Sequence, residues 1–316
     1  MKLLGAALVV ILFSPLAWGQ NSPLVLKDND RVVFVGSELV EVDAQYGYFE
    51  TMLQARFPKA HFTFRNLGWS GDTVWGDARS EFGTQQDGYQ KLVDEVISAK
   101  PTVLLIAYGM NESFAGQAGL PHFMQQYDKL LSDLAKTGAR IWLIGPNPHE
   151  NLGPPLPDPA EHNAQLVLYN DAIATLARDH RDGFIDLLKS MKLSASAPHL
   201  TTDGIHFTTR GYWSFGQTMT AHLTNTFAYA RQHRPEQLAA LESLRQLINQ
   251  KNREFFYRWR PQNDTYIFGF RKSEQGRNAV EIPQFDPIVQ KLEQQIDAAK
   301  KSLPAPGDWE LSPPAK

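Results

Sequence analysis

The sequence predicts an α/β protein built on a doubly wound parallel sheet with helices on both faces. Short runs of apolar, β-branched residues alternate with segments of helical periodicity through the first two-thirds of the 316 residues. Runs that are apolar throughout are typical of parallel strands buried on both faces. In such sheets the ligand site lies beyond the carboxyl ends of the strands. The residues that directly follow each strand are therefore the candidates for function.

Five strands and four intervening helices are expected in the first 186 residues. The expected strands are Val32–Val35, Phe62–Arg65, Thr102–Ala107, Arg140–Ile144 and Phe184–Asp186. The expected helices are Tyr48–Phe57, Tyr89–Ala99, Met124–Lys136 and Ala164–Arg178. Strand and helix alternate in this order, which is the pattern of consecutive βαβ units.

A proline-rich segment, "NPHENLGPPLPDPAEHN", follows the fourth expected strand. It forms either a wall of the site or a plain surface loop. It contains His149 and His162, but their spacing matches no metal-binding motif, so no metal ion is expected there.

The character of the sequence changes after about Thr226. Residues 234–260 and 286–303 have the periodicity of two amphipathic helices, and residues 263–285 between them are expected to form a strand, a turn and a proline exit. We divide the chain into a signal peptide at 1–19, an α/β domain at 20–226, a helical extension at 227–303 and a disordered tail at 304–316. The sequence leaves open whether the extension packs on the sheet domain or on a partner subunit.

The N-terminus predicts export. "MKLLGAALVVILFSPLAWGQ" places a lysine before an apolar run and ends in Ala17-Trp18-Gly19, a plausible cleavage site for a signal peptide. A periplasmic or secreted protein, with no membrane span after cleavage, is expected. The chain has no cysteine, which excludes disulfides and thiolate chemistry, and its net charge of −3 does not favour nucleic acid as a partner.

Four segments at strand ends carry residues suited to acyl transfer. Ser37 and Glu38 follow the first strand, and Gly71 lies in "NLGWSGDT" after the second. The side-chain amide of Asn111 follows the third strand and, with the Gly71 amide, can stabilise an oxyanion. Asp203 lies three residues before His206, so a carboxylate can orient a histidine base.

These segments resemble the SGNH/GDSL-type hydrolase superfamily from about Asp30 to Leu223. "FRNLGWSGDTVWG" is also similar to exported members frequent in planctomycete-like bacteria. The resemblance implies a three-layer αβα sandwich on a five-stranded parallel sheet. It further implies that Gly71 and Asn111 are the oxyanion donors and that Asp203 and His206 are the acid and base.

The first motif departs from the family. Members read G-D-S-L, whereas this chain reads G-S-E-L from Gly36 to Leu39, with Glu38 in the serine's place. Ser37 could reach His206 through a different turn, or Glu38 could act as nucleophile or as a base for water. Alternatively, catalysis is lost and the pocket only binds a ligand.

The sequence therefore predicts an exported ester hydrolase, or an inactive protein that binds a carbohydrate or an acylated ligand. Trp69 and Trp75 near Gly71, and Tyr212 and Trp213 after His206, could stack on sugar rings or fill space between helix and sheet. Together with export they favour an acylated carbohydrate as substrate. No phosphate loop or nucleotide motif is present, so no cofactor is expected.

Overall fold

The computed structural model describes residues 23–191, 198–226, 235–274 and 278–303. The expected signal peptide, the tail and the boundary at 227 lie outside them. Within the described residues no helix is both long and apolar enough to cross a membrane.

A five-stranded parallel sheet in the order β2-β1-β3-β4-β5 forms the centre, as predicted. The strands are β1 (Asp30–Gly36), β2 (Phe62–Gly68), β3 (Val103–Ala107), β4 (Arg140–Ile144) and β5 (Gly183–Ile185). The order reverses between β1 and β3, so a crevice opens at the carboxyl ends of these two strands.

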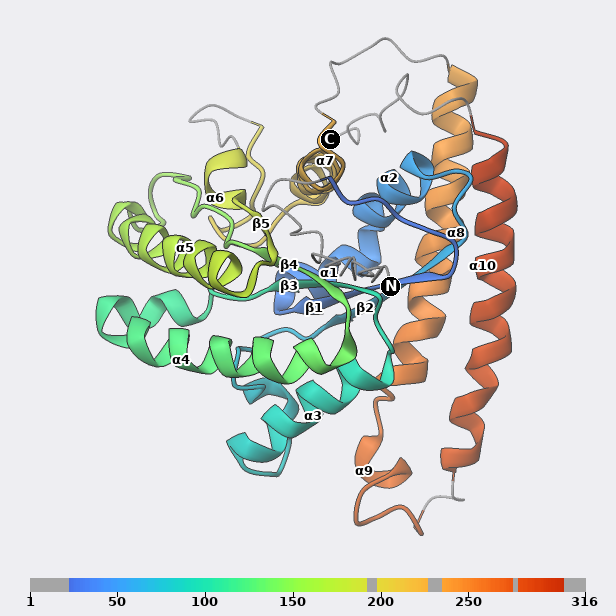
Figure 1. The fold of residues 1–316 in the computed structure, drawn as a ribbon, viewed down its shortest axis with the longest axis horizontal. Helices are drawn as coiled ribbons and strands as arrows, with labels where there is room; N and C mark the ends of the chain where they lie inside the picture. The colour runs from blue at the N-terminus through green and yellow to red at the C-terminus, as the bar shows by residue number, and fades with distance from the viewer. Residues whose placement is uncertain (1–22, 192–197, 227–234, 275–277, 304–316) are drawn as a thin grey trace, which may run out of the picture.

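Helices cover both faces of the sheet (Figure 1). They are α1 (Glu38–Tyr46), α2 (Tyr48–Arg56), α3 (Gln85–Ser98), α4 (Gly116–Leu134), α5 (Ala160–His180), α6 (Leu187–Ser190) and α7 (Thr209–Thr224). Short 3-10 turns are η1 (Asp77–Arg79), η2 (Glu112–Ala115) and η3 (Ala135–Thr137). The predicted αβα architecture is confirmed.

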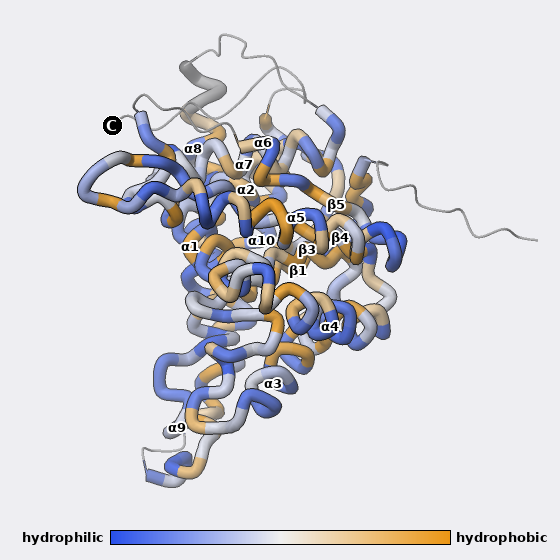
Figure 2. Tube along the Cα trace, turned by 90° about the vertical axis from the view of Figure 1, so that its left-hand side faces the viewer, coloured by the Kyte–Doolittle hydropathy of each residue, from blue (hydrophilic) through white to orange (hydrophobic). Residues whose placement is uncertain are grey.

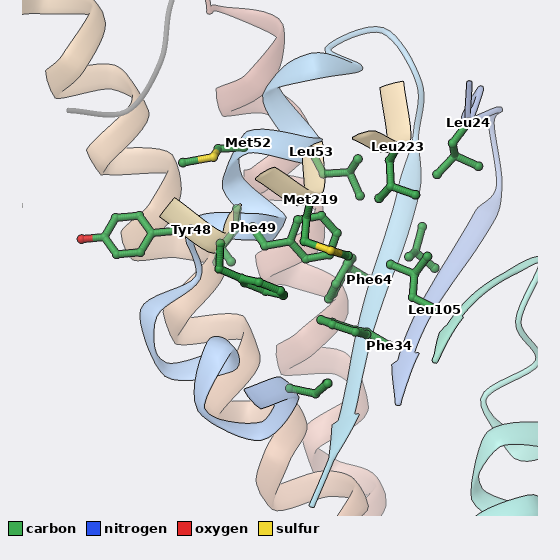
Figure 3. Packing of buried hydrophobic residues seen from close by; sticks show 14 of the residues in the cluster. Leu24, Phe34, Tyr48, Phe49, Met52, Leu53, Phe64, Leu105, Met219 and Leu223 are labelled. Atoms are coloured by element: carbon green, nitrogen blue, oxygen red, sulfur yellow. The ribbon is translucent and has the colours of Figure 1, made fainter. Parts of the chain in front are cut away.

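Each face of the sheet has its own apolar core, as the uniformly apolar strands require. One core gathers around Phe34, Phe49, Phe64 and Phe215 (Figure 3 shows the first three), whose rings pack edge-on and stacked with centroids 5.6–6.4 Å apart. The other core lies against α3, α4 and α5. Figure 2 shows hydrophobic segments around β1 and β3 inside the molecule and many hydrophilic segments at the periphery.

The C-terminal extension packs on the sheet domain. It consists of α8 (Pro235–Trp259), α9 (Asp264–Ile267), η4 (Asn278–Gln284) and α10 (Phe285–Lys301), and α8 and α10 run side by side (Figure 1). Contacts of α8 reach α1, α2 and β2. The strand expected within 263–285 is wrong: Asp264–Ile267 is a single helical turn, because this segment lies away from the sheet and meets no strand edge.

Two buried lysines fasten the extension to α2. Lys251 Nζ donates to Glu50 Oε2 at 2.8 Å and to the Phe64 carbonyl at 3.1 Å, and Lys300 Nζ donates to Gln54 Oε1 at 2.7 Å. Buried charges require such partners, because desolvation is costly. The extension is therefore attached by specific polar contacts as well as by apolar packing.

Asp43 of α1 lies next to the Glu50–Lys251 pair, and its burial lowers the stability of the fold in a pH-dependent way. Burial, and secondarily the charge of Glu50, raises the pKa of Asp43 from 3.8 to about 8, although it accepts a hydrogen bond from the Phe49 N–H. In the unfolded chain this carboxyl ionises from about pH 4. The contribution of Asp43 to stability therefore falls as the pH rises from about 4 to about 8.

Replacing Asp43→Asn should remove this pH-dependent cost, because the side-chain oxygen can still accept from Phe49 while no charge is buried. We expect the variant to match the native protein near pH 4 and to exceed it by about 1–3 kcal/mol in unfolding free energy at pH 8. Urea denaturation at both pH values measures this difference. Parallel pH dependences for the two proteins would contradict the assignment.

Candidate active site

His206 lies between two carboxylates. Its Nδ1 is 2.5 Å from Asp203 Oδ2, and its Nε2 is 2.9 Å from Glu38 Oε2. Burial alone would lower the pKa of His206, but the hydrogen bonds and charges of Asp203 and Glu38 outweigh it and raise the pKa. This arrangement favours an imidazolium ion held by two anions.

The loop that carries Asp203 and His206 is organised by Asp203 itself. Asp203 Oδ1 accepts from the backbone N–H groups of Ile205 and His206 at 3.0 and 2.9 Å, which fixes the turn, while Oδ2 holds the ring. Burial opposes ionisation of Asp203, but these hydrogen bonds lower its pKa to about 2. The carboxylate is therefore charged at every physiological pH.

Glu38 is the first residue of α1, directly beyond β1. The chain turns there at Gly36, where a Cβ atom would lie 2.4 Å from the Ala107 carbonyl oxygen, so no larger residue fits between β1 and β3. Ser37 forms the N-cap and is only 8% exposed, and no hydrogen bond joins its Oγ to His206 within the described residues. The tight turn aims Glu38, rather than Ser37, at the imidazole.

A small cavity of about 40 Å³ opens between these side chains and the ends of β3 and β4. Ser37, Glu38, Asn111 and His206 are among its lining residues. Asn111 Nδ2 donates to the Asp72 carbonyl at 2.8 Å, and because an amide carries two N–H donors, one remains for a ligand. Four of the six predicted site residues thus meet at one cavity, and Asp203 reaches it through His206.

Gly71 lies in the loop that follows β2. Its φ of +78° is a conformation that favours glycine, and no described residue accepts its N–H. It does not line the cavity directly. It precedes Asp72, whose carbonyl holds Asn111, so the two predicted oxyanion donors belong to one hydrogen-bonded unit.

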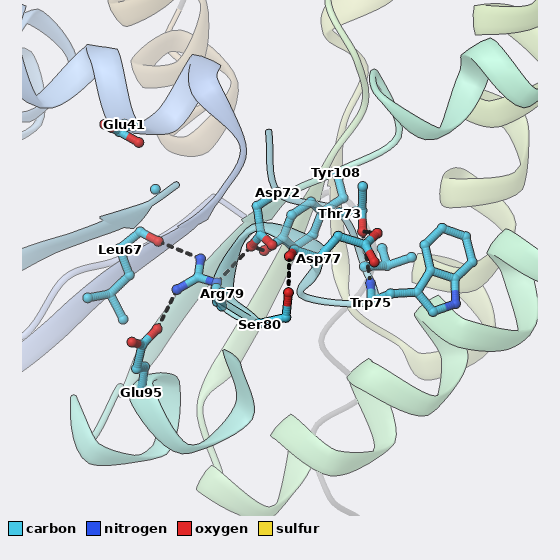
Figure 4. Close-up of polar contacts among 12 residues, drawn as sticks. Glu41, Leu67, Asp72, Thr73, Trp75, Asp77, Arg79, Ser80, Glu95 and Tyr108 are labelled. Carbon is cyan, nitrogen blue, oxygen red and sulfur yellow. Dashed lines mark hydrogen bonds and ion pairs between the residues drawn. The ribbon is translucent and has the colours of Figure 1, made fainter. Parts of the chain in front are cut away.

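A buried network behind the cavity holds this loop (Figure 4). Asp72 Oδ2 accepts from Arg79 Nε and from the Tyr108 hydroxyl, both at 2.7 Å, and Arg79 also donates to the Leu67 carbonyl at 2.9 Å and contacts Glu95. Arg79 and Asp72 have no exposed side-chain surface. The ends of β2 and β3 are thereby joined by charged hydrogen bonds that water cannot screen.

Glu112 provides a second link between the same loops. Its carboxylate accepts from the Val74 N–H at 2.9 Å and from the Gly109 N–H at 2.8 Å. Burial raises the pKa of Glu112 to about 7, although these hydrogen bonds lower it. Glu112 immediately follows Asn111, so the side chain after the amide donor fixes the loop on which that donor sits.

The C-terminal extension also reaches the loop. Glu41 Oε2 accepts from the Ser70 N–H at 2.5 Å and from Arg260 Nη1 at 2.9 Å. The Arg260 guanidinium lies 3.8 Å from the centre of the Trp69 ring. Trp69 thus packs against the extension and does not line the cavity, and the residues just before Gly71 are held from outside the sheet domain.

The proline-rich loop packs against the acid-base loop. Glu150 accepts from the Thr201 N–H at 2.8 Å and from the Thr201 hydroxyl at 2.6 Å, and its own N–H donates to the Gly204 carbonyl. At Gly204, with φ +100°, a Cβ atom would lie 2.7 Å from the His149 ring. His149 and His162 contact each other through their Nδ1 atoms at 2.9 Å. This loop therefore supports the turn that contains Asp203 and His206.

The sequence did not reveal the supporting residues. Asp72, Arg79, Glu112 and Glu41 are charged and show no motif, and a charged side chain is usually exposed. Only the position of Glu112 immediately after Asn111, beyond β3, could have indicated a role. In the described residues no three His, Cys, Asp or Glu side chains are grouped as they would be around a metal ion.

The fold and site together define an α/β protein with a carboxylate–histidine–carboxylate centre at the switch in strand order. Residues 34–213 match the GDSL-like Lipase/Acylhydrolase family, more than half of the chain. The chain belongs to this family of ester-hydrolysing proteins. Among curated proteins none matches the chain.

Three solved structures share the fold at low sequence identity. LAE5, an α/β hydrolase from the metagenome of Lake Arreo, Spain, is 18% identical (TM-score 0.52; 64% of this chain and 99% of that one covered). A catalytic mutant of Axe2, an acetylxylan esterase from Geobacillus stearothermophilus, is 17% identical (TM-score 0.50; 66% and 99%). BT4096, a gut microbial diltiazem-metabolizing enzyme, is 12% identical (TM-score 0.59; 89% and 97%), so its likeness extends into the C-terminal extension.

The Arg79 network should contribute strongly to stability. Replacing Arg79→Met would leave the buried Asp72 carboxylate, and Glu95 beside it, without their cation, so we expect a loss of about 3–5 kcal/mol in unfolding free energy. Arg178→Ala, which removes an exposed pair with Asp179, is the control and should cost less than about 0.5 kcal/mol. Urea denaturation measures the unfolding free energy of both variants. Equal losses would show that the buried network contributes no more to stability than the exposed pair does.

Proposed function

We propose that this protein is an ester hydrolase in which Glu38 activates water and His206 acts as general acid. The observation that carries the proposal is the contact of His206 Nε2 with Glu38 Oε2 at 2.9 Å, where the family places a serine. Membership of the GDSL-like family supports ester hydrolysis as the reaction. The proposed reaction is the ester hydrolysis of the family, but Glu38 activates water in place of attack by a serine.

The reaction needs one water molecule and one proton cycle. Glu38 removes a proton from water as the water oxygen attacks the ester carbonyl carbon, and the oxyanion that forms accepts a hydrogen bond from the free N–H of Asn111. The bond between the carbonyl carbon and the alcohol oxygen then breaks, and His206 Nε2 gives its proton to that oxygen. The proton on Glu38 returns to His206, which leaves a carboxylic acid and an alcohol.

Water activation fits the electrostatics better than direct attack by Glu38. Attack by the Glu38 carboxylate would form an anhydride and expel an alkoxide. An alkoxide is far more basic than a carboxylate, so the intermediate would lose the Glu38 carboxylate again more readily than the alkoxide. The two flanking carboxylates raise the pKa of His206 and favour the protonated ring, so we assign His206 to donate to the leaving oxygen rather than to act as the first base. Asp203 stabilises the imidazolium and holds its orientation throughout.

We propose that the substrate is a short acyl ester of a carbohydrate and that the protein is exported. The cavity of about 40 Å³ suits an acetyl-sized group and leaves no room for a long acyl chain. The acetylxylan esterase among the solved structures supports a sugar ester, and the predicted signal peptide at 1–19 supports export to the periplasm or beyond.

Substitution of Glu38 and Ser37 tests which residue starts the reaction. We expect Glu38→Gln and His206→Ala each to lower kcat on p-nitrophenyl acetate by about 100- to 10,000-fold, because each removes a proton-transfer group. Ser37→Ala is the matched control from the same turn and should change kcat less than about threefold. Initial rates of the purified mature protein measure these effects.

The outcomes separate the three interpretations of the first motif. Loss of activity in Ser37→Ala with retention in Glu38→Gln would replace our proposal with a shifted serine nucleophile. No activity of the native protein on p-nitrophenyl acetate or on acetylated xylan, above a matched blank, would favour a protein that only binds its ligand.

The pH dependence tests the charge of His206. A general acid is active only while protonated, so kcat/KM should fall as the pH rises through the raised pKa of His206. An NMR titration of the His206 ring should give a pKa above the usual value, and in Glu38→Gln this pKa should be lower. A kcat/KM that rises with pH over the same range would instead indicate a neutral histidine base.

A further inference from the structure

We propose that the groove between α1 and α8 is a binding subsite for the neutral sugar chain that carries the ester. The part of this inference that connects the groove to catalysis rests on the proposed function. The groove is a cavity of about 560 Å³ formed where the C-terminal extension packs on the sheet domain. Its charged members are Glu41 and Arg253. Its other polar members are the amide side chains of Gln45, Gln246, Asn249, Gln250 and Asn252.

This concentration of amides indicates the chemistry of the ligand. Each amide offers both a donor and an acceptor, as each sugar hydroxyl does, so the two kinds of group pair in several orientations. The rings of Phe256 and Tyr257 line the same groove, and Tyr257 is 39% exposed. An aromatic ring beside amides gives an apolar surface for the face of a sugar ring.

Asn252 gives an independent indication of a ligand. The residue is only 5% exposed, and its Nδ2 donates to the Ala44 carbonyl at 3.1 Å. Its Oδ1 has no hydrogen-bond donor among the described residues. A buried acceptor without a donor is costly, and a rotation of the Asn252 side chain toward the groove that it lines would let a bound hydroxyl supply one.

Residues of α1 line both the catalytic cavity and the groove. Glu38, Glu41 and Gln45 are spaced at i, i+3 and i+7, so they share a face of the helix. The helix rises 1.5 Å per residue, which places Gln45 about 10 Å along the axis from Glu38. A chain whose acyl group enters the catalytic cavity can thus lay its neighbouring sugar units against Glu41 and the amides.

Direct binding is the first test and does not depend on catalysis. Calorimetry with xylohexaose, cellohexaose and mannohexaose should show binding of at least one to the native protein and to Glu38→Gln. In Gln246→Ala/Gln250→Ala, which removes two exposed amides of the groove, the Kd of that ligand should rise about tenfold. The control Gln290→Ala/Gln294→Ala, an exposed pair with the same spacing on α10, should bind as the native protein does.

Kinetics then connect the groove to the reaction. In Gln246→Ala/Gln250→Ala the KM for acetylated xylan should rise about tenfold, while kcat and KM on p-nitrophenyl acetate stay unchanged, because that small ester contacts only the catalytic cavity.

The inference is overturned if no neutral oligosaccharide binds, if the groove variant binds as tightly as the native protein, or if hexagalacturonate binds more tightly than the neutral sugars. Binding without esterase activity would remove the proposed function but keep the sugar site. Activity on p-nitrophenyl acetate without sugar binding would keep the proposed function but remove the sugar site.

Discussion

The site depends first on the buried ion pair between Asp72 and Arg79. Asp72 uses its side chain to hold Arg79 and Tyr108, and its backbone carbonyl to hold Asn111. Arg79 is in turn bonded to Leu67, the penultimate residue of β2. The loop that follows β2 thereby acquires a fixed position against β3. This ion pair and the Glu112 carboxylate together hold the loops that carry Gly71 and Asn111.

Replacement of the family's serine by Glu38 changes the electrostatics of the whole site. A serine leaves the imidazole with one anionic neighbour and free to accept a proton. Glu38 adds a second anion at Nε2, which raises the pKa of His206 and favours the protonated ring. In the proposed mechanism the Asp203–His206 pair keeps its geometry, and His206 acts as an acid instead of a base. Asn111 keeps its use in that mechanism, because water attack creates the same oxyanion.

The sheet, and the residues that the structure gathers at the cavity, each left a local signal in the sequence. β-branched runs such as Val32–Val35 mark strands, and Asn111 stands at the end of one, where parallel topology gathers functional groups. The region 263–285 misled the sequence reasoning, because "TYIF" has strand propensity but meets no sheet edge in the fold. Arg79 and Lys251 could not be foreseen either. Their burial depends on partners far away in the sequence, such as Leu67 and Glu50.

The position of α1 connects the extension to the candidate active site. This helix begins with Glu38 at the imidazole and packs against both β1 and α8. One turn further, Glu41 receives hydrogen bonds from Ser70, next to Gly71, and from Arg260 at the end of the extension. Any displacement of α8 must therefore act on α1 and on the oxyanion loop together. A ligand that bridges α1 and α8 would oppose such displacement, so occupation of the groove and order at the catalytic cavity are physically coupled.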